Sequence, residues 1–167
     1  MESHWVWYGG SRCIDFVNTR RRADHLRTPD DLADWLRAAG LCDDPGPIDQ
    51  ALFAQALRLR QAIDALLTGT SAEAIETVNG WLTAPRLHVV NGTLELAEKR
   101  DAPHALARIA LDAARLLTSA DRDRVRTCPG PNCGGRFLDL SPAGRRRWCS
   151  MAVCGNRAKA AKHRAAL

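Results

Sequence analysis

The chain has 167 residues, 46% of them hydrophobic and 26% charged, a composition that excludes a disordered protein and allows one domain plus a small module. No apolar run approaches the roughly 18 residues that a membrane-spanning helix needs. The net charge of +5 is uneven: residues 121–167 hold eleven basic and three acidic side chains (+8), and residues 1–120 hold thirteen and sixteen (−3). The basic end can therefore attract polyanions.

The first predicted elements lie on either side of Gly9-Gly10. Aromatic residues before this pair predict a short strand, and the residues after it predict a second strand or the start of a helix. Thr28-Pro29-Asp30-Asp31 predicts a helix start, since Thr28 can cap and proline fits the first helical position. Gly40 is expected to end that helix, and residues 43–47 predict a loop.

Three more helices and one hairpin are predicted further along. Residues 48–68 have apolar side chains at helical spacing. Thr70 and Glu73 resemble a capping box for the next helix, whose buried side is expected to be Ile75, Val78 and Leu82. Asn91-Gly92 between two β-prone runs predicts a hairpin, and the last helix of this part follows Pro103.

Together these elements predict an α+β fold in two parts. Residues 1–120, called the body below, are expected to form a mainly helical bundle with a small antiparallel β element. Residues 121–167, called the finger, are expected to form a small C-terminal module with a short strand over 136–140 and a helix over 155–165.

Four cysteines dominate the finger: Cys128, Cys133, Cys149 and Cys154. They form two C-x4-C pairs separated by fifteen residues, so that two tight turns can face each other around one tetrahedral ion. Four thiolates are a ligand set for one structural Zn²⁺, and they close the coordination shell. The finger has few apolar residues, so we expect it to fold only with the metal.

Basic side chains surround this predicted zinc site. Arg126, Arg136, Arg147 and Arg157 each lie within three residues of a cysteine, where they would lower thiol pKa values or contact phosphates. The helix over 155–165 combines a narrow alanine stripe with a basic arc, which suits a phosphate-lined groove. A solvated basic tail is the alternative. The residues expected to contact double-stranded DNA are Arg145, Arg146, Arg147, Asn156, Arg157, Lys159, Lys162 and Arg164.

Cys154-Gly155-Asn156-Arg157 is the signature of the CGNR zinc finger, and the stretch RTCPGPNCGGRFLDLSPAGRRRWCSMAVCGNRAKAAKHR resembles that family throughout. The upstream segments CIDFVNTRRR and TPDDLADWLRAAGL resemble the ABATE domain. The resemblance covers nearly the whole chain. It implies a bacterial, stress-linked transcription regulator whose finger binds DNA and whose ABATE part senses a small molecule or mediates partner contacts. Pro142-Ala143 depart from an expected arginine-rich stretch, which would remove a phosphate contact.

Asp15 and Asn18, in the motif DFVNT, leave two interpretations open. In one they line a pocket for a small-molecule effector. In the other, Asn18 caps a turn or helix and Asp15 pairs with one of the arginines at 20–22. Cys13 is expected to be a buried core thiol, and Trp35 is expected in the core.

The sequence contains no zinc-deaminase, G-x-S-x-G, P-loop or dinucleotide-binding motif, so we expect no enzyme. The start MESHWVWYGG lacks a basic segment followed by an apolar one, so we expect no signal peptide and a cytoplasmic protein.

A zinc-dependent DNA-binding regulator, working as a homodimer, is the main hypothesis. The alternatives are an RNA- or protein-interaction module with the finger as a scaffold, and a ligand-binding protein that the finger only stabilises.

Overall fold

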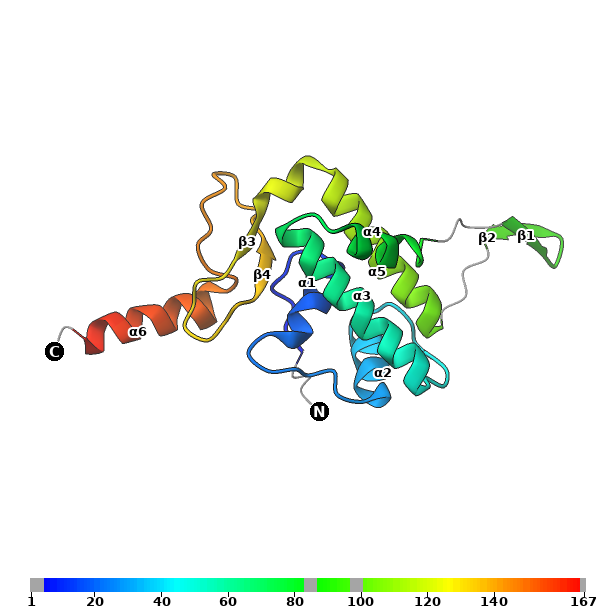
Figure 1. Cartoon of the computed structure of the whole chain (residues 1–167), viewed down its shortest axis with the longest axis horizontal. Coiled ribbons are helices and arrows are strands. Elements are labelled where there is room, and N and C mark those ends of the chain that lie inside the picture. The colour runs from blue at the N-terminus through cyan, green and yellow to red at the C-terminus, as the bar shows by residue number, and fades with distance from the viewer. Residues whose placement is uncertain (1–4, 83–86, 97–100, 166–167) are drawn as a thin grey trace.

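The computed structural model describes residues 5–82, 87–96 and 101–165. Within these ranges it contains six α-helices and two two-stranded antiparallel sheets, which confirms the α+β class. Figure 1 shows helices α1 to α5 gathered in one bundle, with α6 projecting from one end and the hairpin β1–β2 lying at the other. The bundle helices are α1 (Arg12–Val17), α2 (Pro29–Ala38), α3 (Gln50–Thr68), α4 (Ala72–Asn79) and α5 (Ala102–Thr118).

The segment before α1 differs from the predicted strand. Residues 5–8 form no strand, and residues 1–4 lie outside the described part of the chain. The aromatic side chains pack on the bundle instead: Trp5 is buried, and the rings of Trp7 and Trp35 have centroids 5.8 Å apart. After Gly9 the chain turns into α1 and then into the 3-10 helix η1 (Asn18–Arg20), so the helical alternative is the correct one.

The predicted start of α2 is confirmed. The Thr28 hydroxyl accepts a hydrogen bond from the Asp31 amide, and the Asp31 carboxylate accepts one from the Thr28 amide. This reciprocal capping box fixes the first turn. Helix α3 begins two residues later than expected, because Asp49 caps it by accepting from the Leu52 amide at 2.7 Å.

The predicted capping box of α4 is wrong. Ser71 is the cap, accepting from the Ala74 amide at 3.3 Å, so the helix begins at Ala72. The buried side also differs from the expectation, because Ala74 and Val78 are buried whereas Ile75 and Leu82 are 40% and 38% exposed. The apolar spacing marked the helix but not the whole of its buried face.

The hairpin is confirmed as β1 (Leu87–Val90) paired with β2 (Thr93–Leu96). Asn91 and Gly92 have φ values of 51° and 80°, the two left-handed residues that a type I′ turn requires. The last bundle helix, α5, is present as predicted but begins at Ala102, one residue before Pro103 rather than after it, because Asp101 is its cap.

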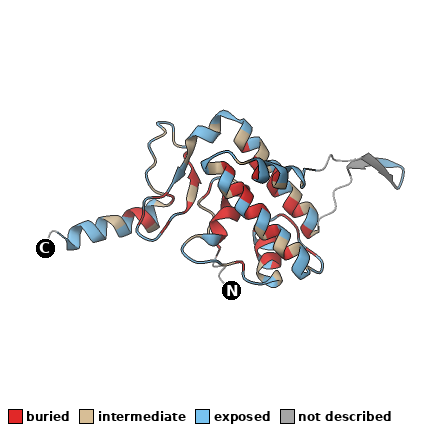
Figure 2. Ribbon diagram, viewed as in Figure 1, coloured by how far each residue is buried: buried red, intermediate tan, exposed pale blue. Residues whose placement is uncertain are grey.

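The bundle is held together by one apolar core in which α1, α2, α3 and α5 face one another (Figure 2). Each large side chain in it contributes about 1.5–3 kcal/mol on burial. Cys13 is fully buried, as expected of a core thiol. The largest completely buried side chains of this core are Trp35, Phe16, Ile14, Leu26, Leu32, Leu36, Leu59, Ile63, Leu106 and Ile109. Across the described ranges, no helix combines the length and the apolar character needed to cross a membrane.

The finger packs directly on this bundle. After the 3-10 helix η2 (Ala120–Arg124), the strands β3 (Val125–Thr127) and β4 (Arg136–Leu138) form an antiparallel pair in which Arg126 lies opposite Phe137. Leu138 joins the core of the body, and its amide donates to the Gly9 carbonyl at 2.7 Å. A π-helical turn, η3 (Met151–Gly155), leads into α6 (Asn156–Arg164).

Candidate metal centre and basic helix

The four cysteines of the finger come together in one buried cluster. The sulfur atoms of Cys128, Cys133, Cys149 and Cys154 all lie within 4.8 Å of one another. The Cys149 sulfur lies 3.7 Å from those of Cys133 and Cys154. A tetrahedral ion with Zn–S bonds of about 2.3 Å has sulfur atoms about 3.8 Å apart. The donor set and its spacing therefore fit one structural Zn²⁺.

Two short loops of the chain place these sulfurs. In the first, the Cys133 amide donates to the Gly130 carbonyl at 3.0 Å, and the Cys128 amide donates to the Gly135 carbonyl at 2.8 Å. The hairpin of β3 and β4 thus brings the first pair together. In the second loop, the one-turn helix η3 carries Cys154, whose amide donates to the Ser150 carbonyl at 2.9 Å.

An arginine from the body reaches these sulfurs. Arg21 donates from Nε to the Cys133 sulfur at 3.0 Å and from Nη2 to the Cys154 sulfur at 3.3 Å, and Nη2 of Arg22 lies 4.0 Å from the latter. The sequence pointed to arginines next to the cysteines, and missed these two. The run of three arginines after the DFVNT motif was the available signal, but its distance along the chain hid the contact.

The arginines expected beside the sulfurs have other positions. Arg136 donates to Asp64 of α3 at 2.8 Å, and the guanidinium of Arg147 lies 4.8 Å from the centre of the Trp148 ring. Arg126 and Arg157 are exposed. Apart from the cysteines themselves, the described side-chain donors to the sulfurs therefore come from the body rather than from the finger.

The surroundings of the thiols shift their pKa values in different directions. Burial would raise the pKa of Cys133, but the hydrogen bond from Arg21 and the neighbouring amide outweigh it and lower this pKa to about 7. Burial raises the pKa of Cys149 and that of Cys128 above the ordinary range. Cys133 is thus the most readily ionised of these three thiols, and zinc binding requires the thiolate form.

The predicted nucleic-acid residues fall into two groups. One group is exposed: Arg145, Arg147, Asn156, Arg157, Lys159, Lys162 and Arg164. Arg146 differs, because its Nε donates to the Trp148 carbonyl at 2.9 Å, its Nη2 donates to the Cys149 carbonyl, and its guanidinium lies over the Phe137 ring. These contacts hold the second ligand loop.

Helix α6 has no buried residue and projects away from the rest of the molecule (Figures 1 and 2). Of its alanine stripe, Ala158 is half-buried, whereas Ala161 and the following Ala165 are exposed. The helix carries no acidic residue. Its first turn joins η3 and Cys154, and the described residues beyond that turn form an exposed, positively charged helix.

Asn18 is the C-cap residue of α1, as one interpretation expected, but the side-chain contacts of Asp15 and Asn18 differ from both interpretations. The Asp15 carboxylate accepts from the Gly9 amide at 2.8 Å, and its described ion-pair partner is Arg12, at 3.9 Å, rather than an arginine at 20–22. Burial raises the pKa of Asp15 to about 6. Asn18 pairs with the backbone of β4, donating to the Arg136 carbonyl at 2.9 Å and accepting from the Arg136 amide at 2.8 Å.

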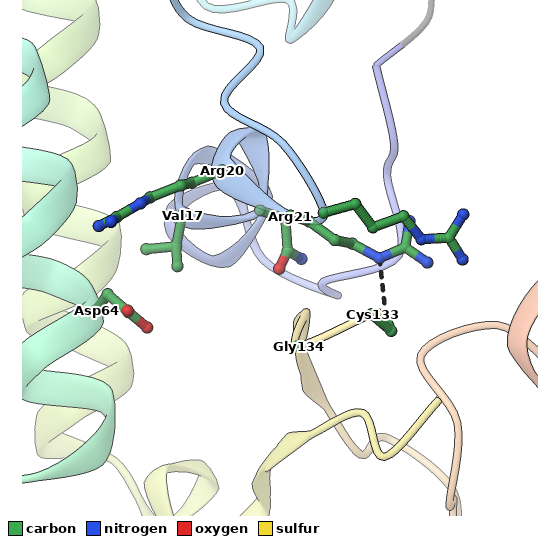
Figure 3. A pocket seen from close by; sticks show the side chains of 8 residues that line it. Val17, Arg20, Arg21, Asp64, Cys133 and Gly134 are labelled. Carbon is green, nitrogen blue, oxygen red and sulfur yellow. Dashed lines mark hydrogen bonds between the residues drawn. The ribbon is translucent and has the colours of Figure 1, made fainter. Parts of the chain in front are cut away.

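A pocket of about 280 Å³ opens where the body meets the finger (Figure 3). In Figure 3, Arg20 extends toward Asp64, whereas Arg21 extends toward Cys133, so the charged groups diverge across the opening. Asn18 lines this pocket and Asp15 does not, but both line a second, much smaller pocket of about 10 Å³. The lining residues of the larger pocket are Val17, Asn18, Arg20, Arg21, Arg22, Asp64, Cys133 and Gly134.

Comparison with protein-family models gives two matches. Residues 10–120 match the ABATE model, described as "Putative stress-induced transcription regulator". Residues 124–166 match the CGNR zinc finger. No curated protein matches the chain.

Proposed function

Since this chain belongs to the ABATE family and ends in a CGNR zinc finger, we propose that it is a transcription regulator that binds double-stranded DNA through its zinc-loaded finger. The zinc site and the two families identify a zinc-binding, regulator-like protein. Binding to DNA is the step that we add. One observation supports it above the others, namely the exposed basic helix α6.

The charge and shape of α6 suit a groove lined by phosphates. Arg157, Lys159, Lys162 and Arg164 are exposed, and none of the described ion pairs involves them. Nine residues span about 14 Å at 1.5 Å per residue, which fits a DNA groove. Four thiolates with Zn²⁺ add about −2, so the finger keeps a net charge of about +6.

The two parts of the chain would divide the work. In this proposal residues 121–167 contact DNA, while residues 1–120 sense a small molecule or hold two copies together. The pocket beside Asn18 supports sensing, because its wall includes the zinc ligand Cys133. A single short finger reads few base pairs, so two copies would be needed for useful specificity. The closed cysteine shell leaves no open coordination position, which supports a non-enzymatic role.

A duplex-binding titration against salt tests the proposal. If four to six side chains contact phosphates, the slope of log K against log salt is expected to be about −4 to −5 for the zinc-loaded protein. The double variant Lys159→Gln, Lys162→Gln should reduce that slope by about 2. Arg115→Gln, an exposed arginine on α5, is the matched control and should leave the slope unchanged. Absence of binding at 50 mM salt would exclude DNA as the partner.

The same assay addresses the alternative in which the finger is a scaffold for RNA or protein contacts. The hydrogen bonds that join the finger to the body, from Asn18 and from the Leu138 amide, are compatible with that alternative. Structured RNA should compete poorly with duplex DNA if the proposal is correct. Tighter binding of the RNA competitor would replace DNA by RNA as the partner.

A further inference from the structure

The zinc ligands receive hydrogen bonds from a residue that lies more than a hundred positions away in the sequence. Arg21 bridges the two halves of the metal centre, because Cys133 belongs to the first C-x4-C pair and Cys154 to the second. Four thiolates around one Zn²⁺ carry a net charge of about −2, so a half-buried guanidinium beside them is well placed. Its planar fork allows one side chain to donate to two sulfurs at once.

The finger leaves space for this side chain at one glycine. A Cβ atom on Gly135 would lie 2.8 Å from Cδ of Arg21 and 3.1 Å from its Nε. It would also lie 3.3 Å from the Asn18 carboxamide oxygen. Any larger residue at 135 would therefore push against the two side chains that connect the body to the finger.

Contacts with the finger on one side and with α3 on the other hold the segment around Arg21 in place. The Arg21 amide donates to the Asn18 carbonyl at 2.9 Å, and the Asn18 side chain pairs with the backbone of Arg136. Beyond Arg21, the buried Arg60 of α3 donates to both carboxylate oxygens of Asp24, at 2.8 and 2.6 Å. The segment from 18 to 24 is thus fixed to α3 at one end and to β4 at the other.

From these contacts we propose that Arg21 is a positioning residue of the zinc centre, and that the body and the metal therefore hold the finger as one coupled unit. Zinc binding orders the sulfurs that accept from Arg21, and the docked body orders the donor. By linkage, each must strengthen the other by the same factor. The proposal rests on the zinc site and not on DNA binding, so the two can fail separately.

Zinc affinity, measured by competition with a chelator on the full-length protein, tests this coupling. Arg21→Gln should weaken zinc binding about 10- to 100-fold, the usual effect of removing a partner of a metal ligand. Arg21→Lys keeps the charge but loses the two-point contact, so its zinc affinity should lie between those of wild type and Arg21→Gln. Arg20→Gln is the matched control, because Arg20 is exposed, lines the same pocket and has no described bond to sulfur. An affinity of Arg21→Gln within twofold of this control would overturn the proposal.

A second variant separates docking from sulfur contact. Asn18→Ala removes the pairing with Arg136 while leaving Arg21 and all four cysteines in the sequence. Coupling predicts that this change in the body also weakens zinc binding, by severalfold. Unchanged affinity would show that the metal centre does not depend on the docked body.

Hydrogen exchange on the unmodified protein gives a test without any variant. When zinc is removed by a chelator, the Arg21 amide should exchange faster, because the segment that carries it loses its partners in the finger. The Leu36 amide, in α2 and away from the finger, should keep its exchange rate. If the Arg21 amide keeps its protection after zinc removal, the local stability of the body does not depend on the metal and the proposal is wrong.

Discussion

The body and the finger are stabilised by different interactions. The described part of the body has ten large side chains that are completely buried in a continuous apolar core, among them Trp35, Phe16 and Ile63. The buried cluster of the finger consists of Phe137 and four cysteines, with Trp148 and Val153 only partly covered. The finger thus has four metal ligands where the body has an apolar core, and segments of this size usually depend on such a metal for folding.

Removing one zinc ligand should give the largest effect. Cys149 contacts the three other ligands, since its sulfur lies 3.7 Å from those of Cys133 and Cys154 and its amide donates to the Cys128 sulfur at 3.4 Å. Structural zinc contributes about 10–16 kcal/mol of apparent binding free energy in small fingers. Cys149→Ser should therefore lower bound zinc well below one ion per chain and unfold the finger, while most of the bundle helicity remains.

Elemental analysis and far-ultraviolet circular dichroism measure these two outcomes. Cys42→Ser is the matched control, because Cys42 is buried in the body and lies outside the cluster. It should keep one zinc per chain. A Cys149→Ser protein that still binds one zinc, or a bundle that unfolds together with the finger, would contradict the view that zinc stabilises the finger and an apolar core stabilises the body.

Two buried carboxylates should give opposite dependences on pH. In the body, burial raises the pKa of Asp15 to about 6, with the Asp112 charge acting in the same direction and the Gly9 amide and Arg12 against it. The folded protein then resists ionisation of this group. Its contribution to stability is greatest below the unfolded pKa of 3.8 and is lost as pH rises toward 6, by up to about 3 kcal/mol.

In the finger, Asp139 behaves in the reverse way. Hydrogen bonds from the Ser141 hydroxyl, and then from the Ser141 and Arg146 amides, hold the pKa of Asp139 below its usual range. Its contribution is present above pH 3.8 and is lost as pH falls through the folded pKa.

Urea denaturation of wild type and Asp15→Asn between pH 4 and 6.5 measures the first effect. The asparagine can still accept from the Gly9 amide but cannot ionise, so the variant should gain stability relative to wild type as pH rises. Zinc loss at low pH affects both proteins alike, so the difference isolates Asp15. If the difference in unfolding free energy between the two proteins is constant over this range, burial does not raise the pKa of Asp15.

The features that the sequence predicted are those set by local chemistry. The Thr28 cap, the Asn91-Gly92 turn and the two C-x4-C pairs each act within a few residues, and each is present in the structure. Where two neighbouring residues can both cap a helix, the spacing of apolar residues does not indicate which of them is the cap. Thr70 and Ser71 are neighbouring cap candidates, and Ser71 is the one used.

The contacts between body and finger could not be predicted in this way. Asn18 bonds to Arg136, and Arg21 bonds to Cys133, over more than a hundred residues of sequence. Nothing in the spacing of these side chains indicates which surfaces meet. The same applies to Arg146, whose contacts with the Trp148 and Cys149 carbonyls hold the second ligand loop and were not indicated by its place in an arginine run.

A matched pair of helix caps gives the smallest and sharpest comparison. Ser71 accepts from the Ala74 amide in the body, and Ser150 accepts from the Val153 amide in the finger, at 3.3 and 3.2 Å. Loss of a serine cap costs about 1 kcal/mol. In the body, Ser71→Ala should lower the free energy of unfolding by that amount and leave zinc affinity unchanged. In the finger, folding and metal binding are one process, so Ser150→Ala should weaken zinc binding about fivefold.

Thr70→Ala is the control for the body, because Thr70 is exposed and caps nothing, so stability should stay within about 0.5 kcal/mol. For Ser71→Ala, Ser150→Ala and Thr70→Ala, chelator competition measures the zinc affinity and urea denaturation measures the free energy of unfolding. If Ser150→Ala lowered the unfolding free energy of the bundle and left zinc affinity intact, the finger would be held by ordinary packing. A metal-held finger requires the opposite result, because its helix start at Ser150 forms only when Cys149 and Cys154 bind their ion.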